Sequence, residues 1–308
     1  PVCVTARQEI DAIIALTEIR DVIVTTFGDL LRVPGGNSSL QKKRAEGRDV
    51  RIVYSASDAL EIAGQNPDKR VVFAGLGFET TAPTVAAAIL SAKAENLKNF
   101  FVLSAHKQVP PALSALMDMK KVRIDGFILP GHVSVIIGMN AYRPFFEKYH
   151  LPCVAAGFEP SDILSALAML VEQIETGNPE PANAYPRAVS EAGNPKAVRI
   201  MRTVFETSDA RWRGIGVIAG SGLEIREQFA AFDAKKQFRL EIPDTAPPDG
   251  CACGEILTGT RTPPECALYK KRCTPTDPVG PCMVSSEGTC AAWFKYGARQ
   301  ASGVSNKK

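Results

Sequence analysis

The sequence has almost no net charge, because 36 lysines and arginines face 33 acids and leave a formal charge of +3. So small an excess gives no reason to expect a nucleic-acid surface. It also has no apolar run long enough to cross a bilayer, since the best one, Ile163 to Val171, is interrupted by Ser165 and is typical of a buried helix. We therefore expect a soluble, cytoplasmic protein with no membrane or nucleic-acid partner.

The motifs of several common enzyme classes are also missing. There is no GKS or GKT phosphate loop, no G-x-S-x-G elbow and no H-E-x-x-H metal motif. Gly75-x-Gly77 lacks the third glycine of a dinucleotide fingerprint. After Gly222 we expect a helix that contains Glu224 and Arg226 and serves packing and surface charge. The sequence therefore does not support the common hydrolase or nucleotide-binding classes of function.

The chain nevertheless has the composition of a folded protein. Its 308 residues are 45% hydrophobic and 22% charged, which fits two or three globular domains. Short apolar runs alternate with segments of helical periodicity, the pattern of parallel sheets covered on both faces. The predicted strands are Val22–Thr26, Arg51–Tyr54, Val71–Gly75, Phe100–Ser104, Gly126–Leu129, Cys153–Ala156 and Gly214–Ala219.

We predict an α/β fold of two Rossmann-like lobes with parallel sheets, followed by a small irregular C-terminal iron–sulfur module. Residues 1–66 with 195–240 are assigned to the first lobe, 67–194 to the second and 241–308 to the module. The stretch 178–194 is rich in Pro, Asn and Gly and is predicted to connect the lobes. Because the chain starts at Pro1 rather than Met, we expect residues upstream to be missing from the first lobe.

Cysteines are concentrated in the last fifth of the chain. Cys251, Cys266, Cys273 and Cys290 are separated by fourteen, six and sixteen residues. Four thiolates from irregular loops suit zinc or an iron–sulfur cluster, and the absence of close C-x-x-C pairs favours a [4Fe–4S] cluster while leaving zinc open. Disulfides are disfavoured in a chain of cytosolic character. The remaining two, Cys253 and Cys282, are interpreted as buried thiols.

Polar residues follow four consecutive predicted strands. They are Glu79 in GLGFETT, His106 in SAHKQ, His132 in PGHVS and Glu159 in GFEP. Ligands bind beyond the carboxyl ends of the strands in open parallel sheets. Either histidine alone would be a structural residue, but the four together predict a site at one sheet edge.

Cys3 is a further candidate. Pro1-Val-Cys3 is the second half of a potential C-P-V-C pair whose first cysteine would precede the recorded start. A C-x-x-C pair before a helix lowers a thiol pKa and supports redox or soft-metal chemistry.

Taken together, these segments resemble the HypD family, which matures [NiFe] hydrogenases. The similar blocks are PVCVT, GFETTAPTVA, LSAHKQVPPAL, ILPGHVSVIIG, PCVAAGFEP and GSGLEIREQF, in the family's order, together with the fourteen, six, sixteen cysteine spacing. The resemblance spans essentially the whole chain. Two family features are lacking: only Cys3 of C-P-V-C is present, and the upstream C-G-G-H-T block is absent, so part of the family's site is missing.

The resemblance implies an assembly scaffold with redox activity rather than a conventional turnover enzyme. Such a protein carries a [4Fe–4S] cluster on Cys251, Cys266, Cys273 and Cys290 and assembles an Fe(CN)2CO unit. It works with a HypC-type chaperone, receives cyanide from a HypE-type donor, and reaches the hydrogenase large subunit through the chaperone. The site residues implied are Cys3, Glu79, His106 and His132, with the cleft side chains orienting thiolates or donating to cyanide nitrogens.

Two other classes of function stay open from the residues alone. The first is an iron–sulfur enzyme acting on a small metabolite in the crevice between the lobes. The second is a zinc-stabilised interaction module without chemistry of its own. Metal analysis distinguishes the zinc-stabilised module from the iron–sulfur functions, because a [4Fe–4S] protein is brown and holds about four irons and four sulfides.

Overall fold

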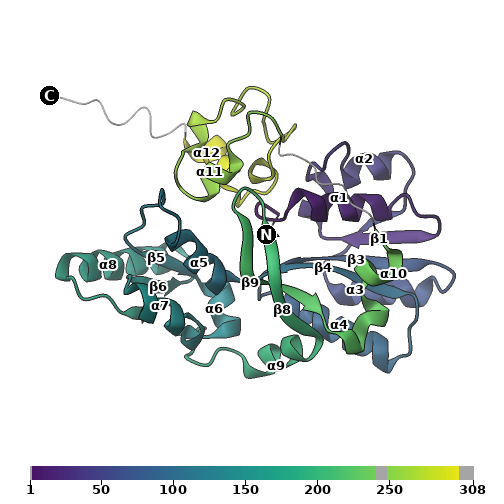
Figure 1. Ribbon diagram of the computed structural model, residues 1–308, viewed down its shortest axis with the longest axis horizontal. Helices are drawn as coiled ribbons and strands as arrows, with labels where there is room; N and C mark the ends of the chain where they lie inside the picture. Colours follow the sequence, from purple (N-terminus) through teal and green to yellow (C-terminus); the bar gives the residue numbers. More distant parts are fainter. Residues whose placement is uncertain (1, 241–247, 298–308) are drawn as a thin grey trace.

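The computed structural model describes residues 2–240 and 248–297. Two α/β lobes lie side by side, and a small module of short helices sits above the point where they meet (Figure 1). None of the helices within these described residues has the length and apolar character needed to span a membrane. The expected boundary of the module near residue 241 falls outside the described ranges.

The larger lobe is built on a six-stranded sheet with the order β2-β1-β3-β4-β9-β8. Its strands are β1 Val22–Thr26, β2 Val50–Ile52, β3 Arg70–Gly77, β4 Phe100–Lys107, β8 Phe205–Trp212 and β9 Gly216–Ile225. The first four are parallel, whereas β9 runs antiparallel to both β4 and β8. The prediction of purely parallel sheets is therefore wrong for this lobe, because β8 and β9 form a hairpin, and hairpin strands are antiparallel.

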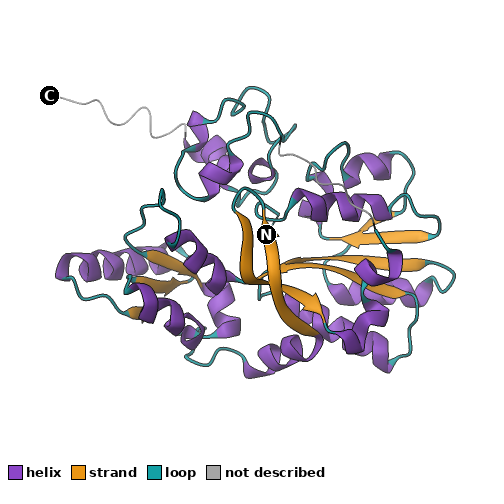
Figure 2. Ribbon diagram, in the orientation of Figure 1, coloured by secondary structure: helices purple, strands orange, loops and turns teal. Residues whose placement is uncertain are grey.

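Helices cover both faces of this sheet (Figure 2). One face packs on α3 Ala56–Gln65, α4 Ala82–Ala94 and α9 Pro195–Val204, and the other on α1 Arg7–Leu16, α2 Leu40–Ala45, η1 Gly28–Arg32 and α10 Ala234–Phe238. In β1, Ile23 faces the first group, while Val22 and Val24 face the second. All five residues of β1 are buried, and its Val-Ile-Val run with two β-branched threonines is why β1 is predicted from the sequence at its observed bounds.

The smaller lobe carries a parallel three-stranded sheet with the order β5-β6-β7. Its elements are α5 Val109–Met117, β5 Phe127–Pro130, α6 Gly131–Ile137, η2 Met139–Tyr142, α7 Arg143–Tyr149, β6 Cys153–Ala156, α8 Pro160–Thr176 and β7 Pro181–Asn183. Sheet pairing places β3 and β4 in the larger lobe, although the sequence analysis assigns 67–194 to the second. The error arises because strand-helix alternation continues unbroken from one sheet to the next.

Two strands and one helix differ from expectation. The short β7 lies within the predicted connection 178–194, and β8 has a mostly polar, half-exposed sequence that gives no apolar signal. Glu224, expected in a helix after Gly222, belongs to β9 instead, and the helical turn η3 begins only at Glu227 and ends at Phe232. α8 ends at Thr176, and Gly177, whose φ is 63°, caps the helix in the left-handed region.

The C-terminal module contains four short helical segments joined by loops. They are α11 Cys253–Leu257, η4 Pro263–Glu265, η5 Pro281–Met283 and α12 Thr289–Tyr296. The buried residues at its centre include five cysteines together with Ile256 and Met283. Because its apolar core is so small, the stability of the module depends on interactions that its sulfur atoms make.

Candidate functional site

The six cysteines of the module line one cavity. Cys251 precedes α11, Cys253 opens it, Cys266 follows η4, and Cys290 lies in the first turn of α12. Cys273 and Cys282 complete the lining with Leu268, Tyr269, Gly280 and Met283. The free space at the centre of these side chains is about 10 Å³, about that of one water molecule. The structure therefore brings all four predicted ligands to one place.

Backbone groups already surround some of these sulfurs. The amide of Val279 donates to Cys273 Sγ at 3.4 Å, and Cys266 Sγ donates to the carbonyl of Gly250 at 3.7 Å. A Cβ atom added to Gly280 would lie 2.9 Å from Cys251 Sγ, so that the glycine leaves space for the sulfur. Amide donors to sulfur are typical of sites where a thiolate is held.

Among the described residues, no three Cys, His, Asp or Glu side chains converge as they would around one metal ion. A [4Fe–4S] cluster differs from a single ion, because each of its four thiolates binds a separate iron and the ligands enclose a volume rather than a point. Six thiols around a common cavity, with no histidine or carboxylate among the lining residues, form a soft donor set of this kind. The residues present fit a cluster of iron and sulfide.

Cys253 and Cys282, interpreted from the sequence as spare thiols, form a close buried pair. Their sulfur atoms are 3.0 Å apart. Hydrogen bonds from Cys251 and Cys282 lower the pKa of Cys253 to about 4, and the charge of Arg213 acts in the same direction. The pKa of Cys282 is raised by the same contact with Cys253. The contact thus favours the thiolate form of Cys253 and the thiol form of Cys282.

Arg213 comes from the turn of the β8–β9 hairpin, whose tip reaches the module (Figure 1). The approach is close: a Cβ atom on Gly214 would lie 2.3 Å from the Cα of Gly254 in α11. Gly214 also has a φ of 74°, which disfavours side chains other than glycine. The hairpin thus fixes the module on the larger lobe and brings a buried guanidinium toward its sulfurs.

Cys3 lies between the module and a cleft of the larger lobe. Its thiol donates to the carbonyl of Pro281 at 3.9 Å, and it packs against the cysteine cluster of the module. A hydrogen bond with Cys282 lowers the pKa of Cys3, against the opposing effect of burial. Cys3 also lines a cleft that Thr26, Phe27, Leu76, Phe78, Thr81, Glu287 and Thr289 border, among others. It is thus in contact with both the cleft and the buried sulfurs.

His132 stands at the start of α6 in the smaller lobe and is exposed. Its ring packs 5.0 Å from that of Phe158, centroid to centroid. Partial burial lowers the pKa of His132, and the charge of Glu287 in the module opposes this shift. Glu287 borders the Cys3 cleft, and it lies close enough to His132 for its charge to act on that ring.

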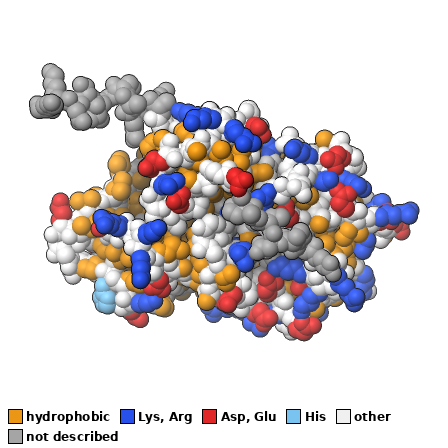
Figure 3. All heavy atoms as spheres, turned by 45° about the horizontal axis from the view of Figure 1, so that its top comes forward, with side chains coloured by type: hydrophobic (Ala, Val, Ile, Leu, Met, Phe, Trp, Pro, Cys, Tyr) orange, Lys and Arg blue, Asp and Glu red, His pale blue; other side chains and the backbone are white. Residues whose placement is uncertain are grey.

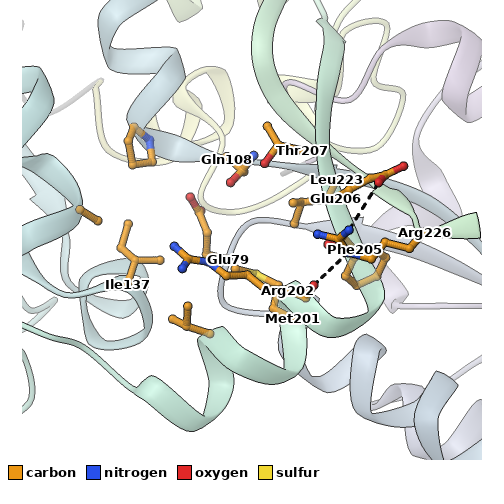
Figure 4. Close-up of a pocket in the computed structure, with 13 residues that line it drawn as sticks. Glu79, Gln108, Ile137, Met201, Arg202, Phe205, Glu206, Thr207, Leu223 and Arg226 are labelled. Carbon is orange, nitrogen blue, oxygen red and sulfur yellow. Dashed lines mark hydrogen bonds and ion pairs between the residues drawn. The ribbon is translucent and has the colours of Figure 1, made fainter. Parts of the chain in front are cut away.

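Glu79 lies in a different pocket, between the two lobes (Figure 4). Gln108, Ile137, Arg202 and Thr207 line the same pocket. Glu79 is 2% exposed, and its Oε1 accepts a hydrogen bond from the amide of Val109 at 2.9 Å. Its Oε2 has no hydrogen-bond partner within the described residues. Burial raises the pKa of Glu79 to about 7, so the carboxyl is partly protonated at neutral pH.

His106 lies inside the sheet beneath that pocket. It is 1% exposed in β4, and its ring packs on Phe205, a residue of the pocket lining. Ser104 Oγ donates to the carbonyl of Leu223 at 2.7 Å, so it accepts from His106 Nδ1 at 3.1 Å, which places the proton on Nδ1. Burial, with Lys107 and Lys235, lowers the pKa of His106 to about 3. The ring is therefore neutral.

The polar residues predicted to share one sheet edge are thus divided. Glu79 and His106 belong to the larger sheet and its inter-lobe pocket, whereas His132 follows β5 of the smaller sheet and faces the module. Glu159 is a surface residue at the start of α8, paired with Arg187 at 3.3 Å. Glu287 and Arg213 are missed by the sequence analysis. The position of Glu287, three residues before Cys290, is the one signal that points to it.

Comparison with known proteins identifies the family of the chain. A sequence profile of the HypD family, described as the hydrogenase formation hypA family, matches residues 1–297. The chain belongs to the HypD family. The predicted resemblance to this family is confirmed by the match.

Several curated relatives are similar over nearly the whole chain. The hydrogenase maturation factor HypD of Azotobacter vinelandii is 46% identical over 307 residues, which cover 97% of this chain and 81% of that protein. Proteins of the same name from Cupriavidus necator and Escherichia coli are 45% and 43% identical, over 96% of this chain and 80% of their own length. The chain is thus similar to hydrogenase maturation factors.

Proposed function

We propose that this chain acts in [NiFe] hydrogenase maturation as an iron–sulfur scaffold that, with a HypC-type chaperone, assembles and carries an Fe(CN)2CO unit. One observation supports this most directly: Cys3 lies at the cleft and also contacts the buried cysteines of the module. A thiol that can bind a metal-containing cargo is thus in direct contact with sulfurs suited to redox chemistry.

In this proposal Cys251, Cys266, Cys273 and Cys290 hold a [4Fe–4S] cluster. When bound, such a cluster supplies or accepts single electrons near the neighbouring thiols. The Val279 amide stabilises charge on Cys273 Sγ, and the loops around Gly250 and Gly280 keep the other sulfurs accessible to the cavity. We place the protein in the cytoplasm, where thiols stay reduced and available.

The Cys253–Cys282 pair gives the scaffold a reversible two-electron store. Exchange with an external disulfide would join the two sulfurs and release the external sulfurs as one thiolate and one thiol, the latter taking the Cys282 proton, and an external dithiol would reverse the step. Arg213 favours the thiolate form of Cys253, which is the attacking species in such exchange. Cys282 also makes a hydrogen bond with Cys3. Oxidation of the Cys253–Cys282 pair to a disulfide would remove the Cys282 thiol from this hydrogen bond.

The cargo would be held in the cleft. A low-spin iron with cyanide and carbonyl ligands prefers thiolate donors, and Cys3, whose pKa is lowered, can provide one while a chaperone cysteine provides another. His132 and Glu287 can donate to or position groups at the opening. Cyanide would come from a HypE-type donor, and delivery to the large subunit would follow through the chaperone. Glu79 and His106 lie outside this cleft, in and beneath the pocket between the lobes.

The experiment is co-expression of the full-length protein, with any residues that precede Pro1 in the natural chain, and a HypC-type chaperone. The complex is purified anaerobically and its infrared spectrum recorded. We expect cyanide and carbonyl bands that disappear in Cys3→Ala and persist in Cys153→Ala, a matched control because Cys153 is buried in β6 within the smaller lobe. A stable complex without either band, or bands unchanged in Cys3→Ala, would contradict the proposal.

The inter-lobe pocket supports a second candidate, an iron–sulfur enzyme acting on a small metabolite. Pockets between domains that contain a buried group with a perturbed pKa are common active sites, and Glu79 is such a group. The two candidates differ in the response to Glu79→Gln. A metabolite enzyme would lose its activity, whereas the scaffold would keep its infrared bands as long as Cys3 and the cluster are intact.

A further inference from the structure

Four large apolar side chains are exposed along one helix of the smaller lobe. On α8, Leu164 is 67% exposed, Leu167 44%, Val171 51% and Ile174 49%. Figure 3 shows hydrophobic side chains at the surface of this lobe, on the left of the view. Isolated exposed apolar residues are ordinary, but a continuous row on one helix marks an interaction surface.

These residues follow a strict spacing of three, four and three, the a and d positions of two heptads. At 100° per residue they occupy an arc of about 80° on the helix surface. The opposite side of α8 is already used, because Ala166 and Leu170 pack on the sheet and Gln173 is buried. A narrow a/d row outside the core face is the seam by which one helix packs on another. We call Leu164, Leu167, Val171 and Ile174 the α8 seam.

The chain segment that contains the α8 seam is acidic. Residues 151–186 contain five acids and no lysine or arginine. Asp162 and Glu159 pair with Arg187, while Glu172 and Glu175 are exposed beside the seam and form no salt bridge within the described part of the chain. Such a surface favours a partner that carries positive charge.

A second copy of this chain does not meet that requirement. In either a parallel or an antiparallel pairing of two α8 helices, acids would face acids or neutral residues, since the helix has no basic residue to offer. Like charges at the flanks of a helix pair are a common device against self-association.

We propose that the α8 seam docks an amphipathic helix of another protein, one that presents apolar residues at the same heptad spacing with lysine or arginine beside them. The seam would provide the apolar contact and Glu172 and Glu175 the charge selection. This inference is independent of the proposed function, because it uses neither the cysteine cavity nor the cleft.

The test uses the full chain and two synthetic helical peptides of about three heptads. Both carry leucine at a and d, one has lysine at e and g, and the other has glutamate. We expect the lysine peptide to bind at least about tenfold more tightly, a difference of about 1.4 kcal/mol. The double variant Leu167→Gln/Val171→Gln should weaken this binding about tenfold or more. Glu172→Lys/Glu175→Lys should reverse the preference between peptides.

Val217→Gln is the matched control, because Val217 is 61% exposed on β9, away from α8, and its change should leave binding unaltered. All variants replace exposed side chains, and thermal unfolding verifies that they fold. Three results would overturn the proposal: no binding of the lysine peptide, equal loss in Val217→Gln, or concentration-dependent dimers in sedimentation that the seam variant disperses.

Discussion

Glu79 offers a quantitative test of the inter-lobe pocket. Its carboxyl is 2% exposed, and burial raises its pKa from about 4.5 to about 7. Between these two pH values the unfolded chain has lost this proton while the folded chain keeps it. The folded state therefore binds more protons, and its stability must fall as the pH rises through this window.

The size of the effect follows from the pKa difference. At about 1.4 kcal/mol for each pH unit, a shift from about 4.5 to about 7 amounts to about 3 kcal/mol. Glu79→Gln removes the titration, and the carbonyl oxygen of the glutamine can still accept from the Val109 amide. We expect wild type and variant to be equally stable near pH 4, and the variant to be more stable by about 3 kcal/mol near pH 8.

The assay is urea unfolding of both proteins at several pH values, with the difference in unfolding free energy plotted against pH so that other titrating groups cancel. Carbon NMR of labelled glutamate side chains gives the pKa of Glu79 directly. Parallel stability profiles of the two proteins from pH 4 to 8, or an NMR titration near 4.5, would refute the assignment of a buried carboxyl facing an inter-lobe pocket.

Three further predictions concern the module and the cleft. Cys273→Ala should lose the cluster and expose the module to limited proteolysis, since little apolar core remains to hold it; unchanged metal content would exclude Cys273 as a ligand. His132→Ala should keep the cluster spectrum but lower hydrogenase maturation in cells, and normal maturation would leave His132 a structural residue. Gly214→Ala should loosen the module by about 1–3 kcal/mol, measured by its protease resistance, because the added Cβ meets Gly254. Gly220→Ala is the control, because Gly220 has a similar φ of 62° and a Cβ added there would meet no atom closer than 3.6 Å. If both substitutions loosened the module equally, the contact between Gly214 and Gly254 would be unimportant.

The sequence predicts those parts of the fold whose residues are buried on both sides. β1 and β6 are buried throughout and are predicted at their observed bounds, and α8 is marked by its periodicity and by Gly177. It does not predict β8, because an edge strand with a polar sequence gives no apolar signal. Nor does alternation of strands and helices show where one sheet ends and the next begins, and for this reason β3 and β4 are assigned to the wrong lobe.

The sequence predicts which residues are candidates for the site better than it predicts which of them lie together in space. Cysteine spacing identifies four residues that do line one cavity. The contact between Cys253 and Cys282 depends on how α11 and η5 pack, which spacing does not encode. The separation of Glu79 from His132 depends on the strands belonging to different sheets. Glu287 and Arg213 reach the site only through tertiary packing.

The central claim is that the C-terminal cysteines hold an iron–sulfur cluster next to the thiols that serve the cleft. The most direct measurement is iron, sulfide and zinc analysis of anaerobically purified protein, together with its electron paramagnetic resonance spectrum after reduction. We predict about four irons and four sulfides per chain and a cluster signal on reduction. A colourless protein with one zinc per chain and no sulfide would contradict the account.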